Sequence, residues 1–197
     1  MSRPPIILAS ASPRRKQLLE WAEIGFEVIV RHTDESWPEG MSIADVPVHI
    51  ARNKAIAVQK EVGAERIILA ADTVVVLNGE IIGKPRDRED AIHILMRLSG
   101  QRHEVITGVA ILGGGEEICF SDVTEVWFHS LTRQQIEGYV DAYRPYDKAG
   151  AYAIQEWIGV VGIRSIRGDF YNVMGLPVSR VFAALADAGG GGSRIGA

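Results

Sequence analysis

A basic stretch near the start of the chain has the residue types of an anion-binding site. Ser10 and Ser12 precede Pro13, and Arg14 and Arg15 follow it directly. Because proline fits the first turn of a helix, this spacing predicts a helix that begins at Pro13 and carries both arginines in its first turn. The N-terminus of a helix is partially positive, so cations there call for a compensating anion. The stretch therefore predicts a phosphate site, with a solvated basic turn as the alternative.

A single carboxylate interrupts a long apolar run. Asp72 and Thr73 lie within residues 67–77, which are otherwise apolar and predict a buried strand. Buried carboxylates nearly always have a partner or a metal, so we expect Asp72 to lie at a strand end or to face a pocket. A partly desolvated carboxylate suits a general base or a Mg²⁺ ligand. A structural salt bridge or a cap is the alternative.

A lysine follows the hairpin that the same run predicts. Asn78-Gly79 is a strong signal for a tight turn, so the chain should fold back along residues 74–77. Lys84 would then return towards Asp72. A lysine and a carboxylate beside a basic helix start are typical of phosphoryl chemistry, although Lys84 alone would be an ordinary surface lysine.

Other polar residues could complete such a site. Asp34-Glu35 offers two carboxylates in a polar loop, and Lys54 lies on a predicted helix. Lys148 and Gln155 belong to a polar, glycine-containing segment that could line a pocket. The amide of Gln155 has both a donor and an acceptor for the edge of a base. Solvated surface residues are the alternative in each case.

The composition excludes several function classes. The chain has 197 residues, of which 47% are hydrophobic and 23% charged, as in a globular protein of one domain or a core with a smaller lobe. A net charge of −4 provides no global basic field for nucleic acid. Cys119, the single cysteine, should be packed in a strand and permits no internal disulfide or cysteine-based zinc site. The five histidines lack metal-ligand spacing and should be hydrogen-bonded or solvated. Neither a membrane span nor a signal peptide is evident, so we expect a cytoplasmic protein.

Alternating strand and helix patterns must position these residues. Strands are predicted at residues 5–9, 26–30, 67–77, 80–83, 102–112 and 117–129. Helices are predicted to start at or near Pro13, Asp45, Asp87, Thr132 and Pro177. Residues 144–176 should be irregular, with short strands. We expect one domain over residues 1–187 and a disordered glycine-rich tail over residues 188–197.

Short motifs follow one another in an informative order. They are Ser10-Ala-Ser-Pro-Arg-Arg, Asp34-Glu35, Ala51-Arg-Asn-Lys54-Ala, Ala71-Asp72-Thr73, Gly83-Lys84-Pro85, Leu98-Ser-Gly, Thr107-Gly, Asp147-Lys-Ala-Gly-Ala-Tyr152 and Gly175-Leu-Pro177. Each motif alone is weak, but the ordered set is specific. Over about residues 5–186 the chain resembles the Maf-type nucleoside triphosphate pyrophosphatases, and residues 147–155 resemble their dTTP/UTP-preferring branch.

The resemblance implies a fold, a reaction and a set of roles. The fold would be α/β, a mixed sheet with flanking helices and a deep cleft between two lobes (Maf/ITPase-like), often as a homodimer. The reaction would hydrolyse dTTP and UTP to the nucleoside monophosphate and pyrophosphate with a divalent cation, Mg²⁺ or Mn²⁺, for nucleotide-pool cleansing and with a proposed link to cell-division arrest. Asp72 and Lys84 would be the catalytic residues, with Asp72 as the proton acceptor and Lys84 on the phosphates, and Glu35 and Asp72 would bind the metal. The implied substrate-binding residues are Ser10, Arg14, Arg15, Lys54, Thr73, Lys148 and Gln155.

Two other function classes remain open at this point. A non-hydrolysing nucleotide-binding regulator of cell division could use the same basic residues. A carboxylate beside a triphosphate would repel it unless a metal or chemistry is involved, so Asp72 favours the enzyme. A nucleic-acid-binding module is disfavoured by the net charge of −4 and by the lack of an extended basic stripe with interleaved aromatics. We therefore expect a nucleoside triphosphate as the partner, and neither nucleic acid nor a membrane.

Overall fold

A computed structural model describes residues 4–188, which form two compact units. Within the described residues, unit 1 comprises residues 4–72, 108–121 and 175–188, and unit 2 comprises residues 73–107 and 122–174. The strands are β1 (Ile6–Leu8), β2 (Phe26–Val28), β3 (Ile68–Leu77), β4 (Glu80–Ile82), β5 (Arg102–Gly113), β6 (Glu116–Phe128) and β7 (Ile163–Arg167). The helices are α1 (Pro13–Trp21), α2 (Val46–Val62), α3 (Arg88–Leu98), α4 (Arg133–Tyr143), the 3₁₀ turn η1 (Ala149–Ala151), α5 (Trp157–Gly162), α6 (Phe170–Met174) and α7 (Val178–Ala188).

The strands pair in both directions. Hydrogen bonds join them in the order β2-β1-β3-β5-β6-β7, and β4 pairs with β3. β1 is parallel to β2 and β3, whereas the pairs β3·β4 and β6·β7 are antiparallel. The expected mixed α/β fold with flanking helices is therefore confirmed. The cleft between two lobes and the domain end at residue 187 stay predictions, and residues 189–197 of the expected tail lie outside the described residues.

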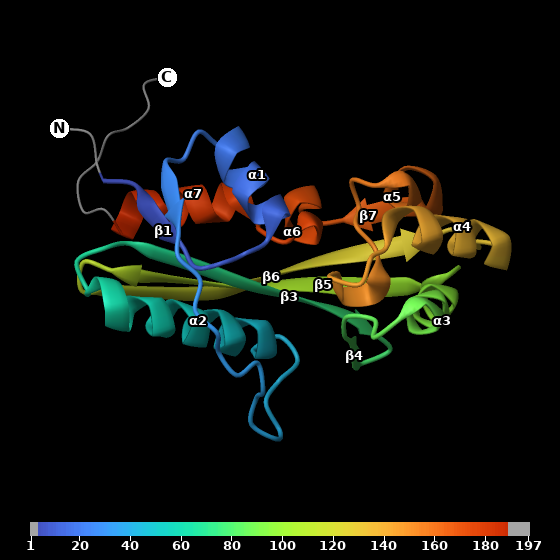
Figure 1. Cartoon of the computed structure of the whole chain (residues 1–197), viewed down its shortest axis with the longest axis horizontal. Helices are drawn as coiled ribbons and strands as arrows, with labels where there is room; N and C mark the ends of the chain where they lie inside the picture. The colour runs from blue at the N-terminus through green and yellow to red at the C-terminus, as the bar shows by residue number, and fades with distance from the viewer. Residues whose placement is uncertain (1–3, 189–197) are drawn as a thin grey trace. The chain divides into compact units, whose positions relative to one another are not determined.

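Unit 1 has helices on both faces of its strands. α2 covers one face, and α1 and α7 lie over the other (Figure 1). Ala51, Ala55 and Val58 of α2 are fully buried and pack with apolar residues of β1, β3 and β5. The part of β3 in this unit is thereby shielded from water, which explains why residues 68–71 are all apolar and buried.

A glycine lets α2 approach β5 closely. A Cβ atom built on Gly108 would lie only 2.1 Å from the backbone nitrogen of Val48 and 2.5 Å from the carbonyl oxygen of Pro47. No larger residue fits there unless the helix moves away. Gly108 therefore fixes the first turn of α2 on the strand, and with it the position of Lys54 about two turns further along.

Unit 2 packs its helices around a second apolar core. Side chains of α3, α4 and β5 join Phe128 and Tyr152 in that core. The predicted caps are confirmed: the Asp87 side chain accepts a hydrogen bond from the backbone of Asp90, and Thr132 forms a capping box with Gln135.

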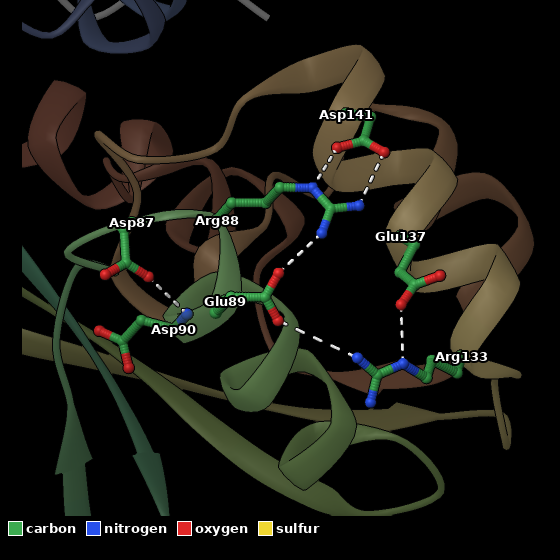
Figure 2. Close-up of polar contacts among 7 residues, drawn as sticks. All are labelled: Asp87, Arg88, Glu89, Asp90, Arg133, Glu137 and Asp141. Atoms are coloured by element: carbon green, nitrogen blue, oxygen red, sulfur yellow. Dashed lines mark hydrogen bonds and ion pairs between the residues drawn. The ribbon is translucent and has the colours of Figure 1, made fainter.

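Ion pairs join α3 to α4 on the outside of this core (Figure 2). Arg88 donates two hydrogen bonds to Asp141, at 2.6 and 2.9 Å, and another to Glu89. Arg133 pairs with Glu137 at 2.7 Å and reaches Glu89 at 4.0 Å. Single exposed pairs contribute little, but this network connects two helices through five side chains and so restricts their relative movement.

Residues 144–176 contain more helix than the sequence predicts. Besides the short strand β7, they form η1, α5 and α6. α5 has the sequence WIGVVG, whose glycines and β-branched residues are poor helix formers. Packing overrides that preference: a Cβ on Gly159 would lie 1.7 Å from the carbonyl oxygen of Ile154, so only glycine permits this close turn. Over residues 4–188, no helix is both long and apolar enough to cross a membrane.

Candidate functional site

The basic helix start lies where the sequence predicts it. α1 begins at Pro13 with Ser12 at its N-cap position, so Arg14 and Arg15 occupy the first turn. The Ser12 side chain makes no capping hydrogen bond. The Ser12 backbone N–H instead donates to the hydroxyl of Ser10, at 3.3 Å. The chain after β1 therefore folds around the Ser10 hydroxyl.

Arg15 is buried, contrary to the alternative of a solvated basic turn. Its guanidinium donates from Nη1 to Oγ of Ser10 at 3.1 Å and from Nε to the carbonyl oxygen of Gly175 at 2.8 Å. Burial lowers the pKa of Arg15 to about 10, an effect that Asp72 and Glu35 partly oppose through their negative charges. Arg15 thus keeps its charge at neutral pH while it is removed from water, the state in which an anion is bound most strongly.

Asp72 pairs with a lysine instead of lying at a strand end. It is the fifth residue of β3, and its side chain is 15% exposed. The ammonium of Lys54 donates to Oδ1 of Asp72 at 2.7 Å and contacts Oε1 of Glu35, also at 2.7 Å. Of the two expected positions, the strand end is wrong because β3 continues through Asp72, and a position facing a pocket stays a prediction. The salt bridge that the sequence left open is present. This Glu35–Lys54–Asp72 triad joins a loop, a helix and a strand.

The two carboxylates of the triad are residues that could hold a divalent cation. Among residues 4–188, no three His, Cys, Asp or Glu side chains converge as a group that could hold a metal. Mg²⁺ is commonly held by one or two carboxylates, with water and substrate phosphates completing its coordination. Glu35 and Asp72 meet that requirement, since both carboxylates already converge on one cation, the Lys54 ammonium.

The charges of this part of unit 1 nearly cancel. Arg14, Arg15 and Lys54 oppose the carboxylates of Glu35 and Asp72, leaving one excess positive charge. A triphosphate carries several negative charges, so the excess alone does not neutralise it. A divalent cation held by the two carboxylates would make the group strongly positive, which fits a polyphosphate ligand.

In unit 2, the hairpin of β3 and β4 places the residue before Lys84 next to the segment that carries Lys148. Asn78 and Gly79 adopt the positive φ angles of a tight turn, and β4 returns along β3, with Ile82 opposite Val75. The backbone N–H of Gly150 then donates to the carbonyl oxygen of Gly83 at 3.1 Å. This hydrogen bond joins Gly83, the residue before Lys84, to Gly150, two residues after Lys148. The approach of Lys84 to Asp72 stays a prediction.

Lys148 is far more buried than a surface lysine. Its side chain is 10% exposed, and its ammonium contacts Asp147 at 2.8 Å and Glu156 at 3.6 Å. Gln155, next to Glu156, is exposed. Glu156 was not predicted as a site residue, and its place beside Gln155 in the sequence gives no signal of its contact with Lys148.

Thr73 belongs to a polar network in unit 2. Its hydroxyl contacts that of Thr107 at 2.9 Å, and Thr107 donates to the backbone oxygen of Asn172 at 3.1 Å. The Asn172 amide donates in turn to Val105 and Thr124. This network holds Thr73 in one orientation on β3, as a residue that contacts a ligand requires.

Two further side chains of the described residues, Cys119 and His103, have reactive groups of other kinds. Cys119 lies on β6 and is exposed, so the expectation that it is packed is wrong. Its thiol contacts the Glu117 carboxylate, and removal of the sulfur atom from water together with that negative charge raises the pKa of the thiol to about 11. A thiol of this kind is a poor nucleophile at neutral pH. His103 is buried and hydrogen-bonded, as expected, through Nε2 to the Tyr152 hydroxyl at 2.7 Å, whereas its Nδ1 atom has no partner among the described residues.

Comparisons with known proteins identify the family of this chain. A family model described as Maf-like protein matches residues 5–188. The chain is 48% identical over 180 residues to a Cytophaga hutchinsonii protein named dTTP/UTP pyrophosphatase, covering 91% of this chain and 82% of that protein. It is 45% identical over 188 residues to a Bacteroides fragilis protein of the same name, covering 94% and 96%. The solved structure of the Staphylococcus aureus Ham1 protein aligns with 64% of this chain and 72% of that chain, at 17% identity and a TM-score of 0.45. Because the family model spans nearly every described residue and such relatives cover most of the chain, this protein belongs to the Maf-like protein family.

Proposed function

We propose that this protein is a nucleoside triphosphate pyrophosphatase that hydrolyses dTTP and UTP to the nucleoside monophosphate and pyrophosphate. The observation that carries the proposal is the 48% identity over 180 residues to a protein named dTTP/UTP pyrophosphatase. The buried arginine and the carboxylate–lysine triad of unit 1 are the groups that such a reaction needs.

The phosphates would be bound first at the start of α1. Ser10 and Gly175 fix the guanidinium of Arg15 from two sides, so little conformational entropy is lost when it meets a phosphate oxygen. Arg14 in the same turn adds a second guanidinium, and Lys54 adds an ammonium. By the family resemblance, Lys84 and Lys148 would also contact phosphates.

Asp72 would accept the proton of the attacking water. Its carboxylate is held by Lys54, so one oxygen is fixed in place and its direction is set. A positioned general base contributes about 10²–10⁴ in rate. A divalent cation, Mg²⁺ or Mn²⁺, held by Glu35 and Asp72, would neutralise the charge that develops on the phosphates. Arg15 would stabilise the same charge from the side of α1.

The nucleobase of the substrate would be recognised by Gln155, with contributions from Thr73 and Arg14. The amide of Gln155 can pair with a carbonyl and an imide N–H on one edge of uracil or thymine. Cytosine presents an amino group and an unprotonated nitrogen on that edge. A site whose donor and acceptor match uracil or thymine would leave both groups without hydrogen bonds when cytosine is bound. Such a site therefore rejects CTP.

The proposal extends to the setting in which the enzyme works. We infer a homodimer in the cytoplasm that removes unwanted nucleotides from the pool, with a link to cell-division arrest. These inferences rest on the family resemblance alone.

A product assay tests the proposal directly. The purified protein is incubated with dTTP, UTP, CTP, ATP or GTP, with Mg²⁺ or Mn²⁺, and pyrophosphate is separated from orthophosphate. We expect monophosphate and pyrophosphate from dTTP and UTP. Release of orthophosphate, or a lead for CTP or a purine nucleotide, would contradict the proposal. Nucleotide binding without any product would instead support the non-hydrolysing regulator.

A further inference from the structure

One tyrosine hydroxyl connects two parts of the segment that carries Lys148 and Gln155. The Tyr139 side chain is buried in unit 2, and its hydroxyl accepts a hydrogen bond from the backbone N–H of Ala153 at 3.3 Å. The same hydroxyl donates to Oε2 of Glu156. Ala153 and Glu156 flank Gln155 and its neighbour, so this one phenol holds the backbone before the exposed glutamine and the side chain of the residue after it.

Glu156 passes this constraint on to Lys148. Its second oxygen, Oε1, lies 3.6 Å from the Lys148 ammonium, while Oε2 is held by Tyr139. Asp147 lies closer to that ammonium, at 2.8 Å, but the Asp147 side chain is 60% exposed, against 20% for Glu156. Water and salt screen the more exposed Asp147 carboxylate more strongly than that of Glu156, so Glu156 also contributes to holding the nearly buried Lys148.

Ion pairs between helices and ring stacking hold Tyr139 in place. α4, which carries Tyr139, is joined to α3 by the ion pairs Arg88–Asp141 and Arg133–Glu89 (Figure 2). Tyr139 also stacks on Tyr143, with ring centroids 4.9 Å apart. Burial and the Glu156 carboxylate raise the pKa of Tyr139 above its usual range, so its hydroxyl stays a donor at every working pH.

We propose that Tyr139 and Glu156 act as a positioning pair, which orients Lys148 and Gln155 for the nucleotide. The inference rests on the proposed function, because it assigns the pair a role in that reaction. Neither residue touches the reacting atoms: Glu156 acts through Lys148, and Tyr139 acts through Glu156 and the backbone of Ala153.

Two conservative variants probe the pair, with a matched control on the same helix. Tyr139→Phe removes only the hydroxyl, and Glu156→Gln removes the charge that faces Lys148 but keeps an acceptor for Tyr139. We expect kcat/KM for dTTP to fall about three- to tenfold in each, since a small misplacement of binding groups lowers rate. Tyr143→Phe alters an exposed neighbour of the same type and should leave kcat/KM unchanged.

A double-mutant cycle separates positioning from a general loss of structure. If Glu156 acts through Lys148, Glu156→Gln should have no further effect on kcat/KM in a Lys148→Met background, whereas independent structural effects would add. If Lys148→Met is too slow to assay, the cycle is completed with the dissociation constant of the α,β-imido analogue of dTTP. Additive effects, or variants with native kcat/KM, overturn the positioning role while dTTP hydrolysis by the native protein stands. A native protein without pyrophosphate release would defeat the proposed function itself, and the positioning role with it.

Discussion

Lowering the pH should destabilise this protein through one buried histidine. The ring of His103 is 1% exposed and packs edge-on against Phe128 and Tyr152. Burial lowers the pKa of His103 to about 3. Among the described residues, its Nδ1 atom has no hydrogen-bond partner, so a second N–H on a protonated ring would find no acceptor there.

The expected loss of stability at low pH follows from the protonation of His103 in the unfolded and in the native state. In the unfolded chain, His103 has an ordinary pKa of about 6.5, so below that pH the unfolded state binds a proton that the native state excludes. The contribution to the free energy of unfolding is therefore fully present above about pH 6.5 and is lost progressively down to about pH 3. One pKa unit corresponds to about 1.4 kcal/mol, so His103 alone should cost about 2 kcal/mol between about pH 7.5 and pH 5.

Urea unfolding of the native protein and of His103→Gln at both pH values measures this contribution. Glutamine can still hydrogen-bond to Tyr152 but does not titrate, so the variant should lose about 2 kcal/mol less stability than the native protein over the same interval. NMR of the native protein gives an independent readout, in which the His103 ring should not titrate between about pH 8 and pH 5. Parallel pH profiles for the two proteins, or a His103 ring that titrates near pH 6.5, would refute the reasoning.

Three further substitutions test the candidate site. Asp72→Asn should lower kcat for dTTP by about 10²–10⁴, because the substitution removes the general base. The thermal unfolding midpoint should stay near the native value, since the shape of the side chain is kept. Near-native turnover would show that Asp72 is not the general base. Arg15→Gln should abolish the rise in that midpoint that pyrophosphate induces. It should also destabilise the free protein by about 1–3 kcal/mol, since the buried carbonyl of Gly175 loses its donor; an unchanged pyrophosphate shift would place the phosphates elsewhere. Gln155→Ala should flatten a preference for dTTP and UTP that we expect to be at least about tenfold over CTP, ATP and GTP in the native enzyme. The five-substrate panel on both proteins measures it, and an unaltered ranking would show that Gln155 does not select the base.

The structure reverses one consequence of the sequence argument about α1. Arg14 and Arg15 in the first turn oppose the helix dipole, which by itself predicts a free protein no less stable without them. In the folded chain, Arg15 is buried and donates to Ser10 and Gly175. A dipole effect of a few tenths of a kcal/mol is outweighed by these hydrogen bonds, so Arg15 supports the fold as well as the expected phosphate site.

The sequence alone determined the features that depend on neighbours along the chain. Helix starts at Pro13, Arg88 and Arg133 are set by residues within one turn, and the hairpin at Asn78-Gly79 is set by two backbone angles. The order of motifs likewise identified the family, since it requires no knowledge of distances. Such local signals survive in the unfolded chain and can be recognised without a fold.

Only the tertiary structure decided which charges meet. Lys54 could have faced solvent, yet the fit of α2 over Gly108 places its ammonium between Glu35 and Asp72. Arg15 meets the carbonyl of Gly175, 160 residues further along the chain. The contact of Tyr139 with Glu156 requires α4 and the segment after η1 to pack together. Side-chain partners of this kind are selected by the packing of whole elements, and periodicity and caps carry no information about that packing.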